Sequence, residues 1–300
     1  MVIPEAKEGK AEVWYTEYHT DDLKLSLRVK RFLHTELSRF QRIDVFESYE
    51  FGVTLALDSR IQTTERDEFC YHEMLVHPAM MTHPNPEQVL IIGGGDGGAA
   101  REVLKHPTVK HVVQVELDEK VVEASKKYMP FLSASFSDPR HQLVIGDGFN
   151  YLDGVTEEFD VVIVDSTDPV GEAKKLFTTE FYSKVKKSLR EEGIVVGQAE
   201  TPFLYPSITK GLYDVVKGIF SNVRLYLTCV PSYQSGMWGF VMGSDGSLEV
   251  DRATLEARYR ERRLQTKFYN PGVHLGLSEL PNFLKTLLGL ERGCSACTRT

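Results

Sequence analysis

The sequence predicts an α/β protein in which a mostly parallel sheet follows a small antiparallel β domain. Three observations support this fold class. Short alternating or apolar runs separated by turns fill the first sixty or so positions, and strand-like and helical segments alternate afterwards. An apolar run at 89–92 also feeds a glycine-rich turn and then a helical segment, which is a nucleotide-binding layout.

The N-terminal part reads as strands at 26–30, 41–47 and 53–58, with a hairpin turn at 49–52 between the last two. These elements predict a β domain over residues 1–62 and a second, Rossmann-like domain over residues 63–300. The second domain opens with a helical pattern at 65–78, and the proline-containing stretch at 83–86 breaks the chain before the first central strand.

The second domain alternates strands and helices. Five strands are predicted at 89–92, 111–116, 142–145, 159–165 and 193–198, with helices such as 118–128 and 178–190 between them. Too little chain separates the apolar runs 223–230 and 237–242 for a helical crossover, so they should pair antiparallel. This is the pattern of a class I methyltransferase-like Rossmann fold, a mostly parallel sheet with an antiparallel end strand.

The composition fits a globular protein, with 42% hydrophobic and 26% charged residues. The net charge of −8 argues against nucleic acid as a partner and suits a cationic ligand. No apolar run approaches the roughly 18 residues of a membrane span, so no membrane association is expected. The N-terminus lacks a signal-peptide core, and a cytoplasmic protein is therefore the expectation.

The glycine turn at 93–98 carries an acidic residue, Asp96. A dinucleotide fold places a pyrophosphate at this position, and a carboxylate would repel it. It would also repel the carboxylate of an ordinary methionine-type cofactor, and it would attract an ammonium or sulfonium. The turn therefore predicts a nucleoside ligand that carries positive charge.

Further acidic residues stand at the carboxyl ends of predicted strands, where open α/β sheets bind ligands. Glu116 lies at the distance from the glycine turn that suits a carboxylate holding a ribose diol. Asp147 follows the next strand and could accept a hydrogen bond from an adenine amino group, although Asp-Gly is also a common turn. Asp165 and Asp168 follow the strand at 159–165, and this pair could bind a diamine or remove a proton from an ammonium.

These features together resemble the spermidine synthases, the polyamine aminopropyltransferase family. Its signature is carried by 61–74 (IQTTERDEFCYHEM), 89–98 (VLIIGGGDGG) and 165–169 (DSTDP). Shorter matches at 38–41 (SRFQ), 197–200 (GQAE), 231–233 (PSY) and 268–270 (FYN) with His274 keep the family order over nearly the whole chain.

The resemblance implies that the co-substrate is decarboxylated S-adenosylmethionine and that the acceptor is a small-molecule amine, with 5′-methylthioadenosine as the second product. Asp165 would be the general base, supported by a hydrogen bond from Tyr71. Co-substrate contacts would come from Gln41, Gln62, His72, Gly93, Gly95, Asp96, Glu116, Asp147 and Gly148. Acceptor contacts would come from Asp168, Glu200, Tyr233 and Trp14.

The same resemblance implies a homodimer or homotetramer that pairs through the N-terminal region. Because a sulfonium is already a good leaving group, we expect neither a metal ion nor a prosthetic group. Cys294 and Cys297 have metal-motif spacing, but they lack the two further ligands of a zinc site.

Alternatives remain at two levels. A small-molecule methyltransferase shares the fold, although Asp96 argues against it, and a non-catalytic polyamine sensor would not need Tyr71, Asp165 and Asp168 together. Putrescine is the acceptor that the resemblance implies. Gln234 stands where many relatives carry proline, so agmatine, cadaverine or a longer polyamine also fits.

Overall fold

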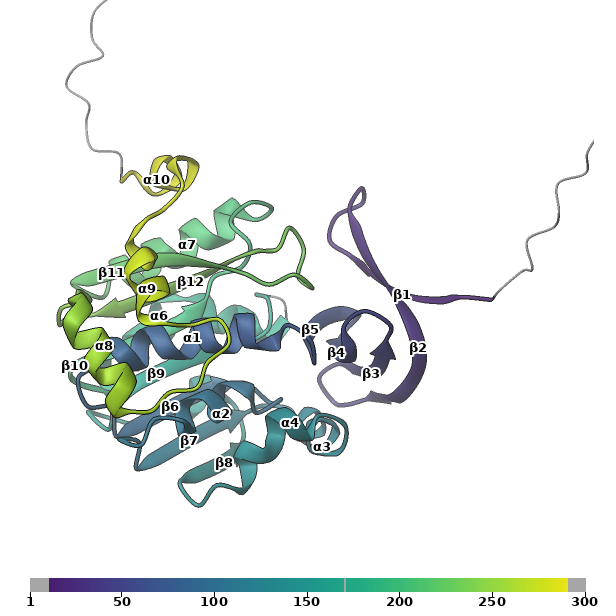
Figure 1. Ribbon diagram of the computed structural model, residues 1–300, viewed down its shortest axis with the longest axis horizontal. Coiled ribbons are helices and arrows are strands. Elements are labelled where there is room, and N and C mark those ends of the chain that lie inside the picture. Colours follow the sequence, from purple (N-terminus) through teal and green to yellow (C-terminus); the bar gives the residue numbers. More distant parts are fainter. Residues whose placement is uncertain (1–10, 170, 291–300) are drawn as a thin grey trace, which may run out of the picture. The chain divides into compact units, whose positions relative to one another are not determined.

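The computed structural model describes residues 11–169 and 171–290, and Cys294 and Cys297 lie outside them (Figure 1). The chain forms two compact units, and the boundary between them along the sequence lies between Arg66 and Asp67. The sequence-based boundary lay at residue 62. The N-terminal unit is longer because its last strand, β5 (Arg60–Thr64), continues past that point in antiparallel pairing with β4 (Gly52–Leu57).

The N-terminal unit is one antiparallel sheet in the order β1-β2-β3-β4-β5. The remaining strands are β1 (Val13–Tyr18), β2 (Lys24–Leu37) and β3 (Arg42–Ser48). Three strands of this sheet match the predicted runs, whereas β1 and β5 were not predicted. In β1 the usual pattern is inverted, because Trp14 and Tyr18 are exposed while Glu17 is buried and accepts the Ile61 N–H at 3.1 Å.

The second unit is built on a seven-stranded sheet in the order β11-β12-β10-β9-β6-β7-β8. Its strands are β6 (Gln88–Gly93), β7 (His111–Glu116), β8 (His141–Ile145), β9 (Phe159–Asp165), β10 (Leu189–Gln198), β11 (Asn222–Cys229) and β12 (Met237–Ser244). The five strands from β8 to β10 are parallel, and β12 runs antiparallel to both β10 and β11. The predicted fold class is confirmed.

Helices cover both faces of this sheet, as Figure 1 shows. They are α1 (Glu68–Thr82), α2 (Gly98–Leu104), α3 (Glu119–Tyr128), α4 (Pro130–Ser133), α5 (Gly148–Tyr151), α6 (Thr179–Ser188), α7 (Pro206–Lys217), α8 (Arg252–Glu261), α9 (Pro271–Leu275) and α10 (Asn282–Leu288). Alternate residues of β9 enter two cores. Val161 and Ile163 pack with α1, α2 and α8, while Val162 and Val164 pack with α6, α7 and α10.

Helix α1 continues four residues past Pro78, where the predicted helix ended. Proline has no N–H, so the carbonyl of Met74 loses its helical donor. The hydroxyl of Tyr226, on β11, donates to this carbonyl at 2.9 Å. A side chain from the sheet therefore satisfies the group that the proline leaves open, and the helix can bury its whole length.

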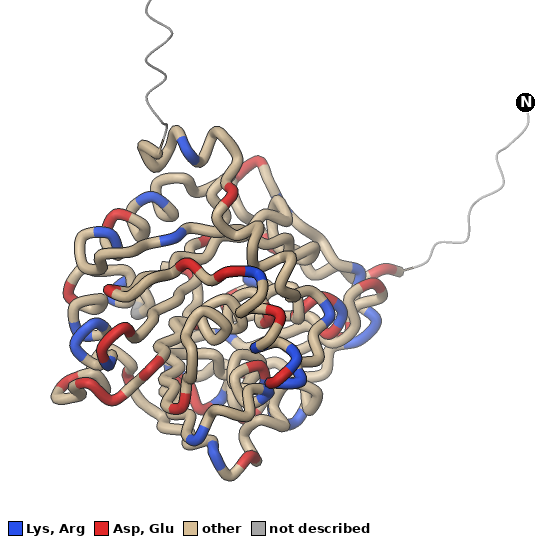
Figure 2. Tube along the Cα trace, turned by 60° about the vertical axis from the view of Figure 1, so that its left-hand side comes forward, with Lys and Arg blue, Asp and Glu red and all other residues tan. Residues whose placement is uncertain are grey.

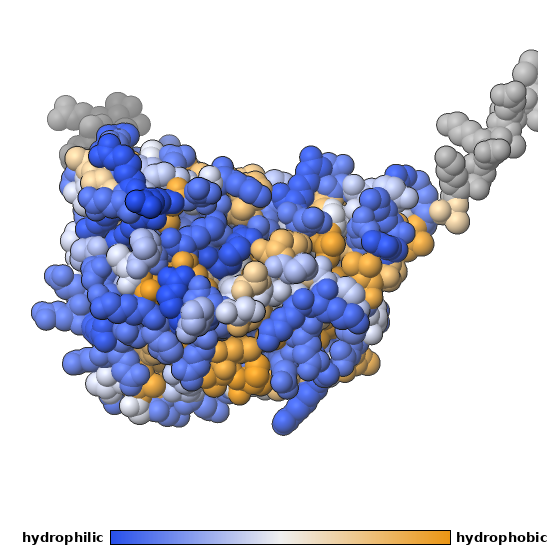
Figure 3. Space-filling model, turned by 60° about the horizontal axis from the view of Figure 1, so that its bottom comes forward, coloured by the Kyte–Doolittle hydropathy of each residue, from blue (hydrophilic) through white to orange (hydrophobic). Residues whose placement is uncertain are grey.

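Basic and acidic residues are interspersed along the trace (Figure 2). Within the described residues, no helix combines the length and apolar character needed to cross a bilayer. Hydrophobic residues are visible among hydrophilic ones on the face drawn in Figure 3. The N-terminal unit exposes several large apolar side chains, namely Val13, Trp14, Tyr18, Leu23, Phe32, Leu37, Phe40 and Tyr49.

Candidate active site

The candidate site lies at the carboxyl ends of β6, β7 and β9, which are neighbours in the parallel sheet. Gly93 at the end of β6 is in register with Asp165 at the end of β9. On the other side of β6, β7 ends at Glu116, paired with Ile145 of β8. The strand order thus brings together acidic residues that are far apart in the sequence.

The glycine turn after β6 packs directly against these acids. Gly93 has a φ of 88°, and a Cβ there would stand 2.2 Å from the carbonyl oxygen of Asp165. A Cβ on Gly95 would lie 3.0 Å from the carboxylate of Glu116. Gly93 therefore lets the main chain of Asp165 approach the turn, and Gly95 does the same for the carboxylate of Glu116. The side-chain amide of Gln114, buried on β7, donates to the carbonyls of Gly93 and Gly94 and fixes the turn from below.

Tyr71 and Asp165 form the first pair in the site. The hydroxyl of Tyr71, in the first half of α1, donates to Oδ1 of Asp165 at 2.8 Å. Burial raises the pKa of Asp165 from 3.8 to about 6, while His72 and the Tyr71 hydrogen bond lower it and Asp96 raises it. The carboxylate is thus mostly ionised at neutral pH, yet it binds a proton far more readily than an exposed aspartate does.

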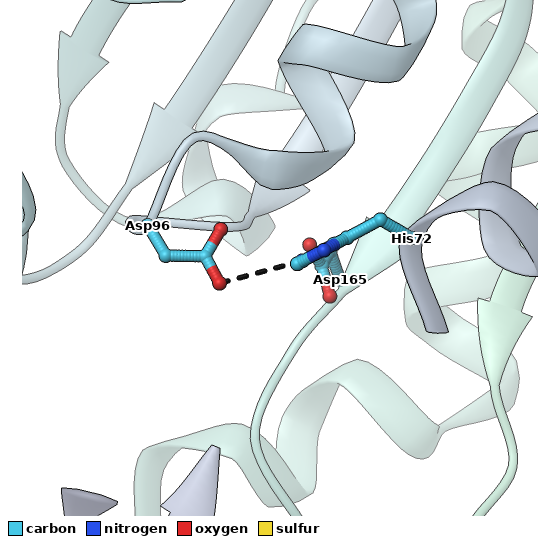
Figure 4. Close-up of side chains that lie close together, drawn as sticks. All are labelled: His72, Asp96 and Asp165. Atoms are coloured by element: carbon cyan, nitrogen blue, oxygen red, sulfur yellow. Dashed lines mark ion pairs between the residues drawn. The ribbon is translucent and has the colours of Figure 1, made fainter. Parts of the chain in front are cut away.

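His72 and Asp96 form the second pair (Figure 4). The imidazole Nε2 lies 3.4 Å from Oδ2 of Asp96, and Nδ1 lies 2.8 Å from Oε2 of Glu68. Although burial favours the neutral ring, the two carboxylates raise the pKa of His72 well above its ordinary value. Asp96 also caps the turn by accepting the Gly98 N–H at 2.7 Å. The sequence pattern did not reveal that His72, whose raised pKa favours a positive charge, lies beside Asp96.

The described part of the chain contains one group of side chains with metal-ligand spacing, in which atoms of His72, Asp96 and Asp165 lie within 4.8 Å of one another. Both imidazole nitrogens face carboxylate oxygens, and these carboxylates raise the pKa of His72 well above its ordinary value, which favours the imidazolium. An imidazolium has no lone pair to offer a metal, so the charged ring is itself the positive charge beside Asp96.

Glu116 and Asp147 occupy the ends of β7 and β8. Burial raises the pKa of Glu116 from 4.5 to about 7, and its Oε1 accepts the Asp118 N–H at 2.8 Å. Asp147 caps α5 by accepting the Phe149 N–H at 2.9 Å, and it forms an ion pair with Lys175. The turn role that the Asp-Gly sequence suggested is thus present. Gly148 packs closely behind it, since a Cβ there would lie 2.5 Å from Ile92.

Two loops bring further predicted residues toward Asp165. In the loop after β10, Glu200 is buried with a φ of 62°. In the loop after β11, the ring of Tyr233 lies 5.9 Å from that of Tyr71. The two loops are joined by a 2.8 Å hydrogen bond between the hydroxyls of Thr201 and Ser235. Burial, followed by Asp165, Asp67, Asp96 and Asp168, raises the pKa of Tyr233 well above 10, which indicates that this hydroxyl faces an acidic region.

The other three predicted residues belong to the N-terminal unit. Trp14 is exposed, and its indole N–H donates to Glu12 at 3.3 Å. The Gln62 amide donates to the Arg60 carbonyl at 3.2 Å, and the Gln41 N–H donates to the Ser38 hydroxyl at 3.1 Å. The proposed ligand contacts of these three residues stay predictions.

Several residues that organise the site were missed from the sequence. Glu68 and Arg101 stand behind His72, and Gln114 holds the glycine turn. Asp67 accepts hydrogen bonds from the Ser232 N–H and hydroxyl at 2.6 and 3.0 Å and so fixes the Tyr233 loop. Gln198 accepts the Glu200 N–H at 2.9 Å. Apart from the local contact of Gln198, each acts through a contact between distant segments, and polar residues at these positions carry no periodic signal.

Comparison with known proteins matches this architecture. The spermine/spermidine synthase domain matches residues 68–253, and the spermidine synthase tetramerisation domain matches residues 13–65. The polyamine aminopropyltransferase of Thermoanaerobacter sp. (strain X514) is 46% identical over 278 residues, which are 92% of this chain and 98% of that protein. The polyamine aminopropyltransferase of Shouchella clausii is 44% identical and covers 92% and 99% of the two chains.

Solved structures of spermidine synthases are similar to this chain in both fold and sequence. A spermidine synthase crystallised in complex with the transition-state analogue AdoDATO has a TM-score of 0.90 and 42% identity, covering 93% of this chain and 96% of that one. The spermidine synthase from Thermotoga maritima has a TM-score of 0.89 and 42% identity, covering 94% and 96%. The chain belongs to the spermine/spermidine synthase family. Within that family it is an enzyme of the aminopropyltransferase class.

Proposed function

We propose that this protein transfers the aminopropyl group of decarboxylated S-adenosylmethionine to putrescine or a related amine and releases 5′-methylthioadenosine. The observation that carries the proposal is the pairing of Asp165 with Tyr71, opposite Asp96 and His72. A base of raised pKa thus stands next to a carboxylate that suits an ammonium. The AdoDATO complex of a structure 42% identical to this chain supports the same ligand class.

In this proposal Asp165 is the general base. A protonated amine has no lone pair, so a proton must leave nitrogen before it attacks carbon. The pKa of about 6 leaves the carboxylate ionised at neutral pH. The Tyr71 hydroxyl holds one carboxylate oxygen, which leaves the other to accept the proton. The amine then forms the new C–N bond as the C–S bond breaks, and the bonding electrons leave with sulfur.

The co-substrate would lie along the ends of β6, β7 and β8. We assign its terminal ammonium to Asp96, its ribose hydroxyls to Glu116 and its adenine to Asp147, with Gly93, Gly95 and Gly148 providing close backbone approach. His72, Gln41 and Gln62 complete the proposed set. Aligning nitrogen, carbon and sulfur at near-attack distance would supply much of the rate. The displacement calls on no prosthetic group in this scheme.

The acceptor would lie between the two loops that carry Glu200 and Tyr233. Asp168 and Glu200 offer carboxylates to the far ammonium of a diamine, and Trp14 is the proposed aromatic contact. Putrescine is the acceptor that we favour, and agmatine, cadaverine and longer polyamines are the alternatives. The apolar surface of the N-terminal unit, together with its match to a tetramerisation domain, supports a homodimer or homotetramer.

The deciding experiment supplies each donor with a panel of amines. We expect methylthioadenosine to form with the decarboxylated donor plus putrescine, and not with S-adenosylmethionine. Ranking the amines by kcat/KM then identifies the acceptor. Release of S-adenosylhomocysteine from S-adenosylmethionine would instead identify a methyltransferase, and donor binding without turnover of any amine would identify a sensor.

A further inference from the structure

Behind the proposed donor site, Glu68 and Arg101 form a buried ion pair that the proposed mechanism does not use. Two guanidinium nitrogens of Arg101 donate to the two carboxylate oxygens of Glu68, at 2.7 and 3.0 Å. The Glu68 side chain is 5% exposed. Arg101 is held in turn by Glu102, which also contacts His77 and Lys105. This bidentate geometry fixes where the Glu68 carboxylate points.

Glu68 points at His72, one helical turn further along α1. Its Oε2 lies 2.8 Å from Nδ1, while Nε2 on the opposite edge of the ring faces Asp96 at 3.4 Å. The ring packs directly against the backbone on one side, because a Cβ placed on Gly98 would lie 2.3–2.6 Å from three of its atoms. A carboxylate at each nitrogen favours the doubly protonated ring, in which both nitrogens can donate.

The other groups around His72 strengthen this arrangement. Tyr71 presents its ring edge-on at 5.3 Å, and Asp165 on β9 adds a further negative charge. Arg101 is a cation on the same side, and both it and the imidazole contact Oε2 of Glu68. Burial raises the pKa of Glu68, but His72 and Arg101 lower it more strongly, so that its pKa falls from 4.5 to about 2. Glu68 therefore stays ionised throughout the working pH range.

We infer that Glu68, fixed by Arg101, is a positioning residue that keeps His72 cationic and aimed at Asp96, and that the resulting charge at Asp96 sets the selectivity for the donor. This inference rests on the proposed function, in which Asp96 meets the terminal ammonium. A cationic His72 offsets part of the negative charge of Asp96. Its presence therefore reduces the penalty on a donor that carries a carboxylate and moderates the attraction for the ammonium.

The test is the ratio of donor affinities, Kd of S-adenosylmethionine over Kd of its decarboxylated form, measured by calorimetry from pH 6.5 to 9. His72→Gln keeps a polar side chain without the charge, and we expect this ratio to rise by about 5- to 50-fold at all pH values. Glu68→Gln should leave the ratio near wild type at low pH. It should raise the ratio as pH increases, because His72 then loses its proton within the range.

The double variant separates positioning from a direct effect. If Glu68 acts through His72, the Glu68→Gln/His72→Gln protein has the same ratio and pH profile as His72→Gln alone. The ionisation of the donors themselves appears in every profile and is removed by comparison with His72→Gln. The matched control is Glu73→Gln. Glu73 is a buried carboxylate on the same helix that accepts the backbone N–H groups of residues 267–269, so its loss should lower stability and leave the ratio unchanged.

A measurement on the unmodified protein guards against a variant that does not fold. In protein labelled with ¹⁵N-histidine, the His72 ring, assigned with His72→Gln, should give the cationic signature up to pH 8. A neutral His72 at pH 7 overturns the inference, as does an equal effect of Glu68→Gln with and without His72. Failure of the wild type to form methylthioadenosine would count against the proposed function instead, so the two failures are distinct.

Discussion

Replacing Tyr71 by phenylalanine removes the 2.8 Å hydrogen bond to Asp165 and little else, because the ring keeps its contacts with Phe240 and Tyr233. A hydrogen bond to a charged group contributes about 1.5–3 kcal/mol. Because one pKa unit corresponds to about 1.4 kcal/mol, its loss should raise the pKa of Asp165 by about one to two units.

The sign of the pH effect follows from the proposed role of Asp165 as the general base. Asp165 must be ionised to accept a proton, so activity falls as pH drops through its pKa of about 6. In Tyr71→Phe this acidic limb should move up to about pH 7–8. The variant should then lose about three- to 25-fold in kcat/KM at pH 6.5 relative to wild type and recover most of it by pH 9. Taking the ratio of the two profiles cancels the ionisation of the amine.

Tyr226→Phe is the matched control. It also removes a buried hydroxyl near Phe240, but that hydroxyl donates to the Met74 carbonyl and not to the site. We expect denaturant unfolding to show a loss of about 1–2 kcal/mol with an unchanged acidic limb. If the apparent pKa of the acidic limb in Tyr71→Phe lies within about 0.3 unit of the wild-type value, the Tyr71 hydrogen bond does not lower the pKa of Asp165 and the reasoning is refuted.

Four further predictions follow from the same geometry. Asp165→Asn should lower turnover by about 10²–10⁴-fold while calorimetry shows nearly intact donor binding, and activity within tenfold of wild type would remove Asp165 as the base. Asp96→Asn should weaken the decarboxylated donor and narrow its advantage over S-adenosylmethionine, and an unchanged ratio of the two affinities would exclude Asp96 as the discriminating group. Gly98→Ala should raise the donor KM at least tenfold, because the new Cβ displaces the His72 ring, although alanine favours a helix. Sedimentation at micromolar concentration should show an oligomer, and a 34.0 kDa species would contradict the proposed assembly.

The sheet of the second unit could be predicted well because its inner strands, such as β6, β7 and β9, are buried on both faces and appear as continuous apolar runs. The N-terminal sheet was harder. Strand β1 buries Glu17 and exposes Trp14, and β2 contains two irregularities in register, near Val29 and Phe32. Local alternation cannot reveal such strands, since their pairing is decided by partners elsewhere in the sheet.

Some residues of the candidate site could also be predicted from the sequence, whereas others could not. Asp96, Glu116, Asp147 and Asp165 could be proposed because each follows directly from the end of a strand. Their partners could not, since the cation facing Asp96 is His72 on α1. His72 is held by Glu68, and Glu68 is bound by Arg101 on α2, 33 residues further along the chain. Only the folded packing of the two helices creates that neighbourhood.

The glycine turn and the base are anchored to each other through the main chain. The Gly94 N–H donates to the carbonyl of Asp165 at 2.8 Å, and Gln114 ties the same turn to β7. A change in the backbone of the glycine turn is therefore expected to shift Asp165, and a change at Asp165 to shift the turn. The loops that carry Glu200 and Tyr233 have separate anchors, to Gln198 and to Asp67. Under the proposed assignments, relatives could diverge in amine preference by exchanging these two loops, while the glycine turn and Asp165 would have to change together.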